Sequence, residues 1–419
     1  MDEQIKEAFE ERKKEMEKND WDFHGFPKSA SARPEEIKRI ELSDLHEKYK
    51  ELLYIEDTKR IDVVLAIALS SQIEGETPLW LIVVGASGDM KSVQLNALKG
   101  YNTFFLHKIT SKTLVNGFKD KSRFPDLAPL LDKKIIVIRD MAPLLKLNPT
   151  EKGEIWGQLR DLYDGFAGAS SGMGMDVKYE NISTTLLAGS TPSIDGQILI
   201  HQDLGTRELI YRTKGNVDKK KAMKKCIENE EYEKKITEEL NKITLKFLNS
   251  RQIKRDFISD KVILEIMKIA EYISLTRATA EIDGYEKSLR GNVIPEEPTR
   301  LSKQLKKIFI CLMSLADDYP ENNALEILWK LARSSGNQNR IELIDFLLEH
   351  PNEEFSTSRL AENLKKGKGT IQVETAILWN LGVLECRKVE TSYPDKFYDY
   401  WKLKELYDKD KLKPSLKSM

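Results

Sequence analysis

Cysteine is scarce in this sequence, and its placement argues against two common kinds of site. The chain has 419 residues but only three cysteines, Cys226, Cys311 and Cys386, which lie far apart and form no CxxC pair. Neither a structural zinc site nor a disulfide framework is therefore expected, and a reducing compartment is the natural environment for such a chain.

Long apolar runs and an excess of one charge are also missing. No stretch approaches the 18 apolar residues that suggest a membrane-spanning helix, and the opening MDEQIKEAFEERKKEMEK is too charged for a secretory signal peptide. We therefore expect a cytoplasmic protein with no membrane contact. The 67 basic and 68 acidic residues nearly cancel, so any surface for nucleic acid must be local.

What the sequence does contain is a strand followed by a phosphate-binding pattern. The apolar run WLIVV at residues 80–84 ends in GASGDMKS, and a helical segment begins at Val93. Strand, small-residue turn and helix, in that order, are the context of a nucleotide-binding loop. Lys91 would contact the outer phosphates of ATP, and Ser92 would bind Mg²⁺. The candidate nucleotide-binding residues are Gly85, Ala86, Ser87, Gly88, Asp89, Met90, Lys91 and Ser92.

One residue departs from the pattern GxxxxGK[ST]. Met90 stands where a glycine normally precedes the lysine. A side chain there could weaken or reshape the site, because glycine lets the backbone approach the phosphates closely. An ordinary strand–turn–helix with a surface lysine is the alternative interpretation.

Four further apolar runs predict a sheet. They lie at residues 103–106, 135–138, 185–188 and 209–212, and helical segments separate most of them. This alternation predicts an α/β fold with a parallel sheet flanked by helices, which binds ligands at the carboxyl ends of its strands.

Asp140 follows the third of the five predicted strands. An acid in this place commonly holds Mg²⁺ or positions the attacking water. Its neighbour is Arg139 rather than a second acid, so Asp140 would serve alone or with help from Asp126, Asp132 or Glu151. Capping of the next turn is the alternative role for this carboxylate.

A glycine-rich stretch at residues 165–175 precedes the fourth predicted strand. It has no apolar face that could join a core, so we expect a hairpin that projects from the sheet, with Lys178 as a candidate phosphate contact. A surface loop is the alternative.

Taken together, these motifs resemble those of the AAA+ ATPases. Among these ATPases, they are most similar to the branch that contains the minichromosome-maintenance (MCM) helicases and related ATPases of phages and mobile elements. The resemblance covers about residues 61–316 and a C-terminal domain. GASGDMKS looks like Walker A, and IIVIRD at residues 135–140 looks like Walker B with a single acid. LLAGSTP at residues 186–192 is similar to the sensor 1 strand, which implies that Thr191 holds the attacking water or the γ-phosphate.

Two arginines take roles from the same resemblance. LGTR at residues 204–207 resembles the segment with the arginine finger, so Arg207 would stabilise the transition state at a neighbouring subunit's ATP. That role implies a ring, most simply a hexamer. EPTRL at residues 297–301 looks like the segment that opens the helical lid, with Arg300 as its sensor 2 residue. The predicted hairpin falls where this branch has a pre-sensor-1 hairpin that lines the DNA pore. Surface or lid salt bridges are the alternative for both arginines.

The last hundred residues predict a winged helix–turn–helix. Helical patterns at residues 341–349, 357–364 and 370–381 surround the basic turn KKGKG, and candidate strands follow at 382–387 and 398–403. A recognition helix presents its N-terminal residues to DNA. The candidate DNA-binding residues here are Lys365, Lys366, Lys368, Thr370 and Gln372. Protein contacts or ring regulation are the alternative.

The sequence thus predicts an N-terminal helical segment and linker at residues 1–50, an AAA+ core at 51–215, a helical lid at 216–318 and a winged-helix domain at 319–419. The expected function is an ATP- and Mg²⁺-dependent, ring-forming helicase or translocase for single-stranded or forked DNA in mobile-element replication, with a primase or polymerase as a candidate partner. An initiator or loader with ATP as a slow assembly switch is the alternative, and an inactive scaffold is a weaker third.

Overall fold

A computed structural model describes the chain at residues 39–73, 75–116, 125–171, 175–196, 206–215, 218–255, 258–285, 287–390, 397–405 and 412. The predicted segment before residue 39, the tip of the glycine-rich hairpin, and Leu204 and Gly205 lie outside these residues. Every structural statement below concerns the described part of the chain.

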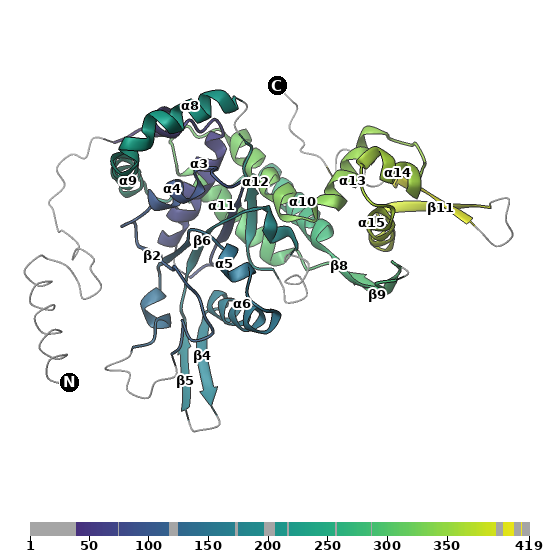
Figure 1. The fold of residues 1–419 in the computed structure, drawn as a ribbon, viewed down its shortest axis with the longest axis horizontal. Coiled ribbons are helices and arrows are strands. Elements are labelled where there is room, and N and C mark those ends of the chain that lie inside the picture. The colour runs from purple at the N-terminus through teal and green to yellow at the C-terminus, as the bar shows by residue number, and fades with distance from the viewer. Residues whose placement is uncertain are drawn as a thin grey trace, which may run out of the picture.

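A five-stranded parallel sheet forms the centre of the molecule, as the sequence predicts (Figure 1). Its order is β2-β3-β6-β1-β7, so β6 separates the strand of the phosphate-binding pattern from the strand that precedes Asp140. The strands are β1 (Trp80–Val84), β2 (Thr103–Phe105), β3 (Ile135–Ile138), β6 (Thr185–Ser190) and β7 (Leu209–Arg212).

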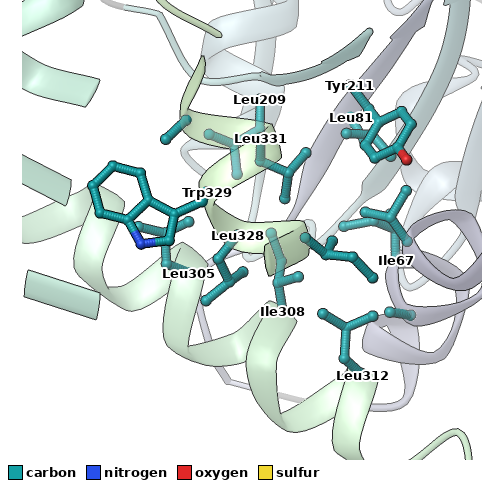
Figure 2. Packing of buried hydrophobic residues seen from close by; sticks show 14 of the residues in the cluster. Ile67, Leu81, Leu209, Tyr211, Leu305, Ile308, Leu312, Leu328, Trp329 and Leu331 are labelled. Carbon is teal, nitrogen blue, oxygen red and sulfur yellow. The ribbon is translucent and has the colours of Figure 1, made fainter. Parts of the chain in front are cut away.

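Helices cover both faces of this sheet, which explains why its strands are continuous apolar runs. Leu81 and Val83 of β1 face one hydrophobic cluster, and Trp80 and Val84 face another. The first cluster takes side chains from α2 (Leu42–Leu53), α3 (Thr58–Leu69), α4 (Lys91–Asn96), α9 (Glu233–Asn249), α10 (Asp260–Arg277), α11 (Thr299–Met313) and α12 (Glu321–Ser335). Figure 2 shows the part where α3, α11 and α12 pack against β1 and β7. The second takes them from α5 (Ala142–Leu145) and α6 (Pro149–Tyr163).

The helices assigned to a lid therefore share a core with the sheet. α9, α10 and α11 belong to the same cluster as α3, and the basic helix α8 (Lys219–Asn229), which has no buried residue, precedes them. Their action as a lid and the domain boundaries stay predictions.

The helix α12 covers the edge strand β7. The backbone N–H of Ile210 donates to Ser335 Oγ at 2.8 Å, and that of Arg212 donates to Ser334 Oγ at 3.1 Å. These hydroxyls satisfy donors that an uncovered edge would leave open to another chain.

Ser335→Ala is expected to lower the free energy of unfolding by about 1–3 kcal/mol, because the buried Ile210 N–H loses its acceptor. Chemical denaturation measures this change. Ser302→Ala is the matched control, since that hydroxyl donates to the carbonyl of Pro298, the residue just before its own helix, and a change of about 0.5 kcal/mol or less is expected there. An equal effect of the two substitutions would contradict the role of Ser335.

Two hairpins extend from the body. The glycine-rich stretch forms β4 (Phe166–Ser171) and β5 (Met175–Glu180), an antiparallel pair that projects from the sheet as predicted (Figure 1). The other hairpin, β8 (Thr279–Ile282) and β9 (Leu289–Ile294), lies within residues 216–318, for which the sequence predicts a helical lid and no strand.

The C-terminal part contains the predicted helices and hairpin. α13 (Gln338–Glu349), α14 (Thr357–Leu364) and α15 (Lys368–Asn380) pack with the antiparallel sheet β10-β12-β11. Its strands are β10 (Phe355–Ser356), β11 (Leu384–Glu390) and β12 (Phe397–Leu403). Among the helices of the described residues, none combines the length and the apolar character that crossing a lipid bilayer demands.

Candidate functional site

The phosphate-binding pattern forms a tight loop between β1 and α4. Gly88 and Met90 both have positive φ, +79° and 54°. Met90 thus adopts the left-handed conformation that the usual glycine would adopt, at a cost of about 1–2 kcal/mol for a residue with a side chain. Its side chain packs on the hydrophobic cluster beneath the loop, which offsets part of that cost. The loop thus accommodates Met90 through a left-handed backbone conformation and packing of its side chain.

Lys91 lies at the centre of this loop. Its Nζ donates to the carbonyl oxygens of Gly85 at 2.9 Å and Ala86 at 2.6 Å. Partial burial lowers the pKa of Lys91, while the negative charges of Asp89 and Asp140 act in the opposite direction.

The carboxyl ends of three strands meet beside the loop. The N–H of Gly85, after β1, donates to the Ser190 carbonyl of β6 at 3.1 Å, and the N–H of Met141, after β3, donates to the Gly189 carbonyl at 2.9 Å. Thr191 follows directly on β6, and Asp140 lies two residues beyond β3. Lys91 begins α4, and its Nζ reaches back to Gly85, the residue after β1. The structure therefore brings the three residues to one edge of the sheet.

Asp140 and Thr191 both have local partners. Asp140 is exposed, and its Oδ1 accepts the N–H of Ala142 at 2.9 Å. One carboxylate oxygen therefore caps the following turn, which is the alternative role that the sequence left open. Thr191 Oγ1 lies 2.7 Å from Ser193 Oγ.

The three acids that the sequence offers as assistants of Asp140 are Asp126, Asp132 and Glu151. Asp126 accepts hydrogen bonds from the Asn116 N–H and the Tyr179 hydroxyl, both at 2.8 Å, and so supports the β4–β5 hairpin. Asp132 precedes β3 and lies at the opposite edge of the sheet. Glu151 is exposed in the first turn of α6. Asp132 is therefore too far away to assist Asp140, and both carboxylate oxygens of Asp126 already accept hydrogen bonds.

Arg207 and Arg300 lie at the amino edge of the sheet, away from the loop. Leu209 pairs with Leu81, so Arg207 sits beside the start of β1. A five-residue parallel strand is about 16 Å long, so neither arginine reaches the loop of its own chain. Arg207 pairs with Asp164 at 2.9 Å, and Arg300 donates to the Thr206 carbonyl at 2.6 Å and contacts Glu296 at 3.3 Å.

These two arginines line a cleft of 780 Å³ between the sheet edge, α11 and the β8–β9 hairpin. Its charged lining residues are Arg207, Arg277, Arg290, Arg300, Glu281, Glu296 and Glu297. Burial lowers the pKa of Arg277, whose guanidinium donates to the Glu208 carbonyl at 2.7 Å. The cleft carries four positive and three negative side chains.

The candidate DNA-binding residues differ in their surroundings. Lys178 is exposed on β5, 3.4 Å from the Asp176 carboxylate. Lys365, Lys368 and Gln372 are exposed in or before α15. Lys366 instead pairs with Glu342 at 2.8 Å, and half-buried Thr370 lines a cavity of 550 Å³ between α15 and the β8–β9 hairpin. The exposed face of α15 thus presents Lys368 and Gln372, whereas Lys366 and Thr370 are engaged within the protein.

Sequence reasoning missed two residues that contact the loop, Arg60 of α3 and Thr213 after β7. Both bind the side chain of Asp89. One signal was available: a charged residue at the start of a helix that is apolar on nearly every face needs a buried partner.

Gly85→Ala is expected to weaken binding of a fluorescent ATP analogue with Mg²⁺ by about tenfold, because overpacking costs about 1–3 kcal/mol. A Cβ at this position would overlap Thr213 Oγ1 and Asp89 Oδ2. A fluorescence titration measures the affinity. Gly153→Ala is the control, since a Cβ there meets no neighbouring atom. Equal affinities of the two variants would contradict the close approach at Gly85.

Comparisons with known proteins leave the family open. No protein-family model and no curated protein matches this sequence. Among solved structures, the chain is similar to the apo C-terminal region of NrS-1, with 13% identity, a TM-score of 0.33, and coverage of 89% of this chain and 79% of that one. It is also similar to a structure described as SCCmec type IV Cch, active helicase, with 13% identity, a TM-score of 0.37, and coverage of 92% and 75%. TM-scores this low do not define a shared fold.

Proposed function

We propose that this protein is an ATP-hydrolysing helicase or translocase of the AAA+ type, which assembles as a ring and moves single-stranded or forked DNA during mobile-element replication. The observation that carries the proposal is the division of the candidate catalytic residues between two edges of one sheet. Lys91, Thr191 and Asp140 gather at the carboxyl edge, and Arg207 and Arg300 lie at the amino edge.

The carboxyl edge suits a nucleoside triphosphate. Lys91 would neutralise the outer phosphates, and Thr191 would orient the attacking water. The exposed Ser92 hydroxyl and Asp140 carboxylate are oxygen donors of the kind Mg²⁺ prefers, so these two residues would hold the ion. When bound, Mg²⁺ draws charge from the phosphate oxygens in the transition state.

The amino edge requires a second subunit. Arg207 and Arg300 are too far from the loop of their own chain, so they would act on the nucleotide of a neighbour whose carboxyl edge faces their cleft. A head-to-tail contact of this kind gives a ring when the rotation from one subunit to the next closes, and a filament when it does not. We propose a closed ring, a hexamer.

The DNA contacts would come from the projecting hairpin and the C-terminal domain. Lys178 of β5 would follow the phosphate backbone in the pore, and α15 of a winged helix would present Lys368 and Gln372 to duplex DNA. We propose that nucleotide turnover moves α9–α11 as a lid, and that a primase or polymerase acts with the ring. Binding through charge weakens steeply as the salt concentration rises.

The alternative proposal is an initiator or loader in which ATP is a slow assembly switch. The single acid at the end of β3 favours it, because one carboxylate must hold Mg²⁺ and also serve the attacking water.

Strand displacement on a forked DNA tests the proposal. The wild-type protein with Mg²⁺-ATP should separate the strands, and the same protein with a non-hydrolysable analogue should bind the fork without separating it. Tight nucleotide retention with sequence-preferring duplex binding and no displacement would favour the switch. Absence of nucleotide binding would overturn both.

A further inference from the structure

Asp89 is an unexpected residue in a loop that receives phosphates, because its carboxylate would repel them. The structure shows where that carboxylate lies. Asp89 Oδ1 is 3.1 Å from Arg60 Nη1, and Oδ2 accepts the Thr213 hydroxyl at 2.6 Å. The absence of a Cβ at Gly85 makes room for this arrangement. Both oxygens are thus occupied by groups from α3 and from the end of β7.

Arg60 also holds the helix that follows the loop. Its side chain is only 3% exposed, and its Nε donates to Gln94 Oε1 at 2.6 Å. The Gln94 amide returns a hydrogen bond to the Arg60 carbonyl at 3.1 Å. One buried guanidinium therefore contacts Asp89, just before Met90, and Gln94, in the first turn after it.

These contacts explain how Met90 keeps a left-handed conformation. The residue is strained by itself, and such strain persists only where the surrounding structure fixes it. Arg60 fixes the chain on both sides of Met90, and Thr213 adds a third attachment through Asp89.

We propose that Arg60 is a positioning residue of the nucleotide-binding loop, which holds the Asp89 carboxylate away from the phosphates and neutralises its charge. This inference rests on the proposed function, since it assigns the loop to ATP. Arginine suits this task because its guanidinium stays charged when buried and offers donors to two partners in one plane.

A double substitution separates charge compensation from structural support. Arg60→Met leaves Asp89 uncompensated beneath the phosphates, and the affinity for a fluorescent ATP analogue with Mg²⁺ should fall about tenfold. Arg60→Met with Asp89→Asn removes that charge as well, and the affinity should return to within about threefold of wild type. Structural support alone predicts no such recovery, because the double variant lacks the same contacts.

Thr213 provides a milder test that keeps the guanidinium. Thr213→Val has nearly the same shape but no hydroxyl, whereas Thr213→Ser keeps the hydroxyl. The valine variant should bind the analogue about fivefold more weakly than the serine variant, because a hydrogen bond to a charged group is lost. Circular dichroism and thermal unfolding of each full-length variant show whether it is folded. If Arg60→Met is not folded, the comparison of the two Thr213 variants takes its place.

The outcomes distinguish this inference from the function on which it rests. A wild-type protein that does not bind the analogue would contradict the proposed function. Binding by wild type, with equal affinity in folded Arg60→Met or no recovery in the double variant, would overturn the role of Arg60 alone. If Arg60→Met is unfolded, equal affinities of the two Thr213 variants would overturn the claim that nucleotide binding depends on holding the Asp89 carboxylate in place.

Discussion

Lys91→Ala is expected to lower the rate of ATP hydrolysis by about a hundredfold or more. Lys91 is the positive charge at the centre of the loop, held by the Gly85 and Ala86 carbonyl oxygens. Removal of one preorganised group that stabilises developing charge costs about 10²–10³ in turnover. The side chain is half-exposed and makes no buried ion pair, so the fold should be retained.

Steady-state hydrolysis of Mg²⁺-ATP measures this loss. Lys99→Ala is the matched control, because Lys99 is exposed just beyond α4 and outside the loop. Equal turnover in Lys91→Ala and in the control would mean that the loop has no role in hydrolysis. The segment would then be an ordinary strand–turn–helix with a surface lysine.

Arg207→Ala is expected to lower turnover about a thousandfold, the range known for an arginine that completes a phosphoryl-transfer site. The residue lies at the edge of the sheet opposite its own loop, so the loss would occur at a neighbour's nucleotide. Arg255→Ala, which breaks an exposed pair with Glu76 on another surface, should retain turnover.

Mixing two inactive variants shows whether Arg207 acts between subunits. In a ring, Lys91→Ala supplies an intact Arg207, and Arg207→Ala supplies an intact loop. Random mixing in equal amounts should therefore restore about a quarter of the wild-type rate. A mixture no more active than its parts, with rings that exchange subunits, would contradict a site shared across an interface.

The sheet could be predicted because its strands are buried on both faces. Such strands are continuous apolar runs, and β1, β3 and β7 lie at the predicted residues. The β8–β9 hairpin could not be predicted in this way, since β9 (LRGNVI) is largely exposed and has neither a continuous nor an alternating apolar pattern.

The candidate site likewise contains residues that the sequence could identify and residues that it could not. Asp140 and Thr191 could be selected because each lies within two residues of the end of a recognisable strand, and Lys91 because it closes the loop pattern that follows such a strand. Parallel strands bring their ends together. For Arg60 the sequence indicates only that a buried partner is needed, and for Thr213 it gives no signal. The two residues lie 29 and 124 residues from Asp89, and only the fold places them beside it. The position of Arg207 opposite the loop likewise depends on strand register, which the sequence leaves open.

Steady-state ATP hydrolysis by the wild-type protein, with and without single-stranded DNA, tests the central claim most directly. A DNA-driven ring motor predicts measurable turnover that DNA increases, and a higher salt concentration should remove the increase. No hydrolysis under either condition would contradict the claim of a motor, and ATP that binds without turning over would favour the assembly switch.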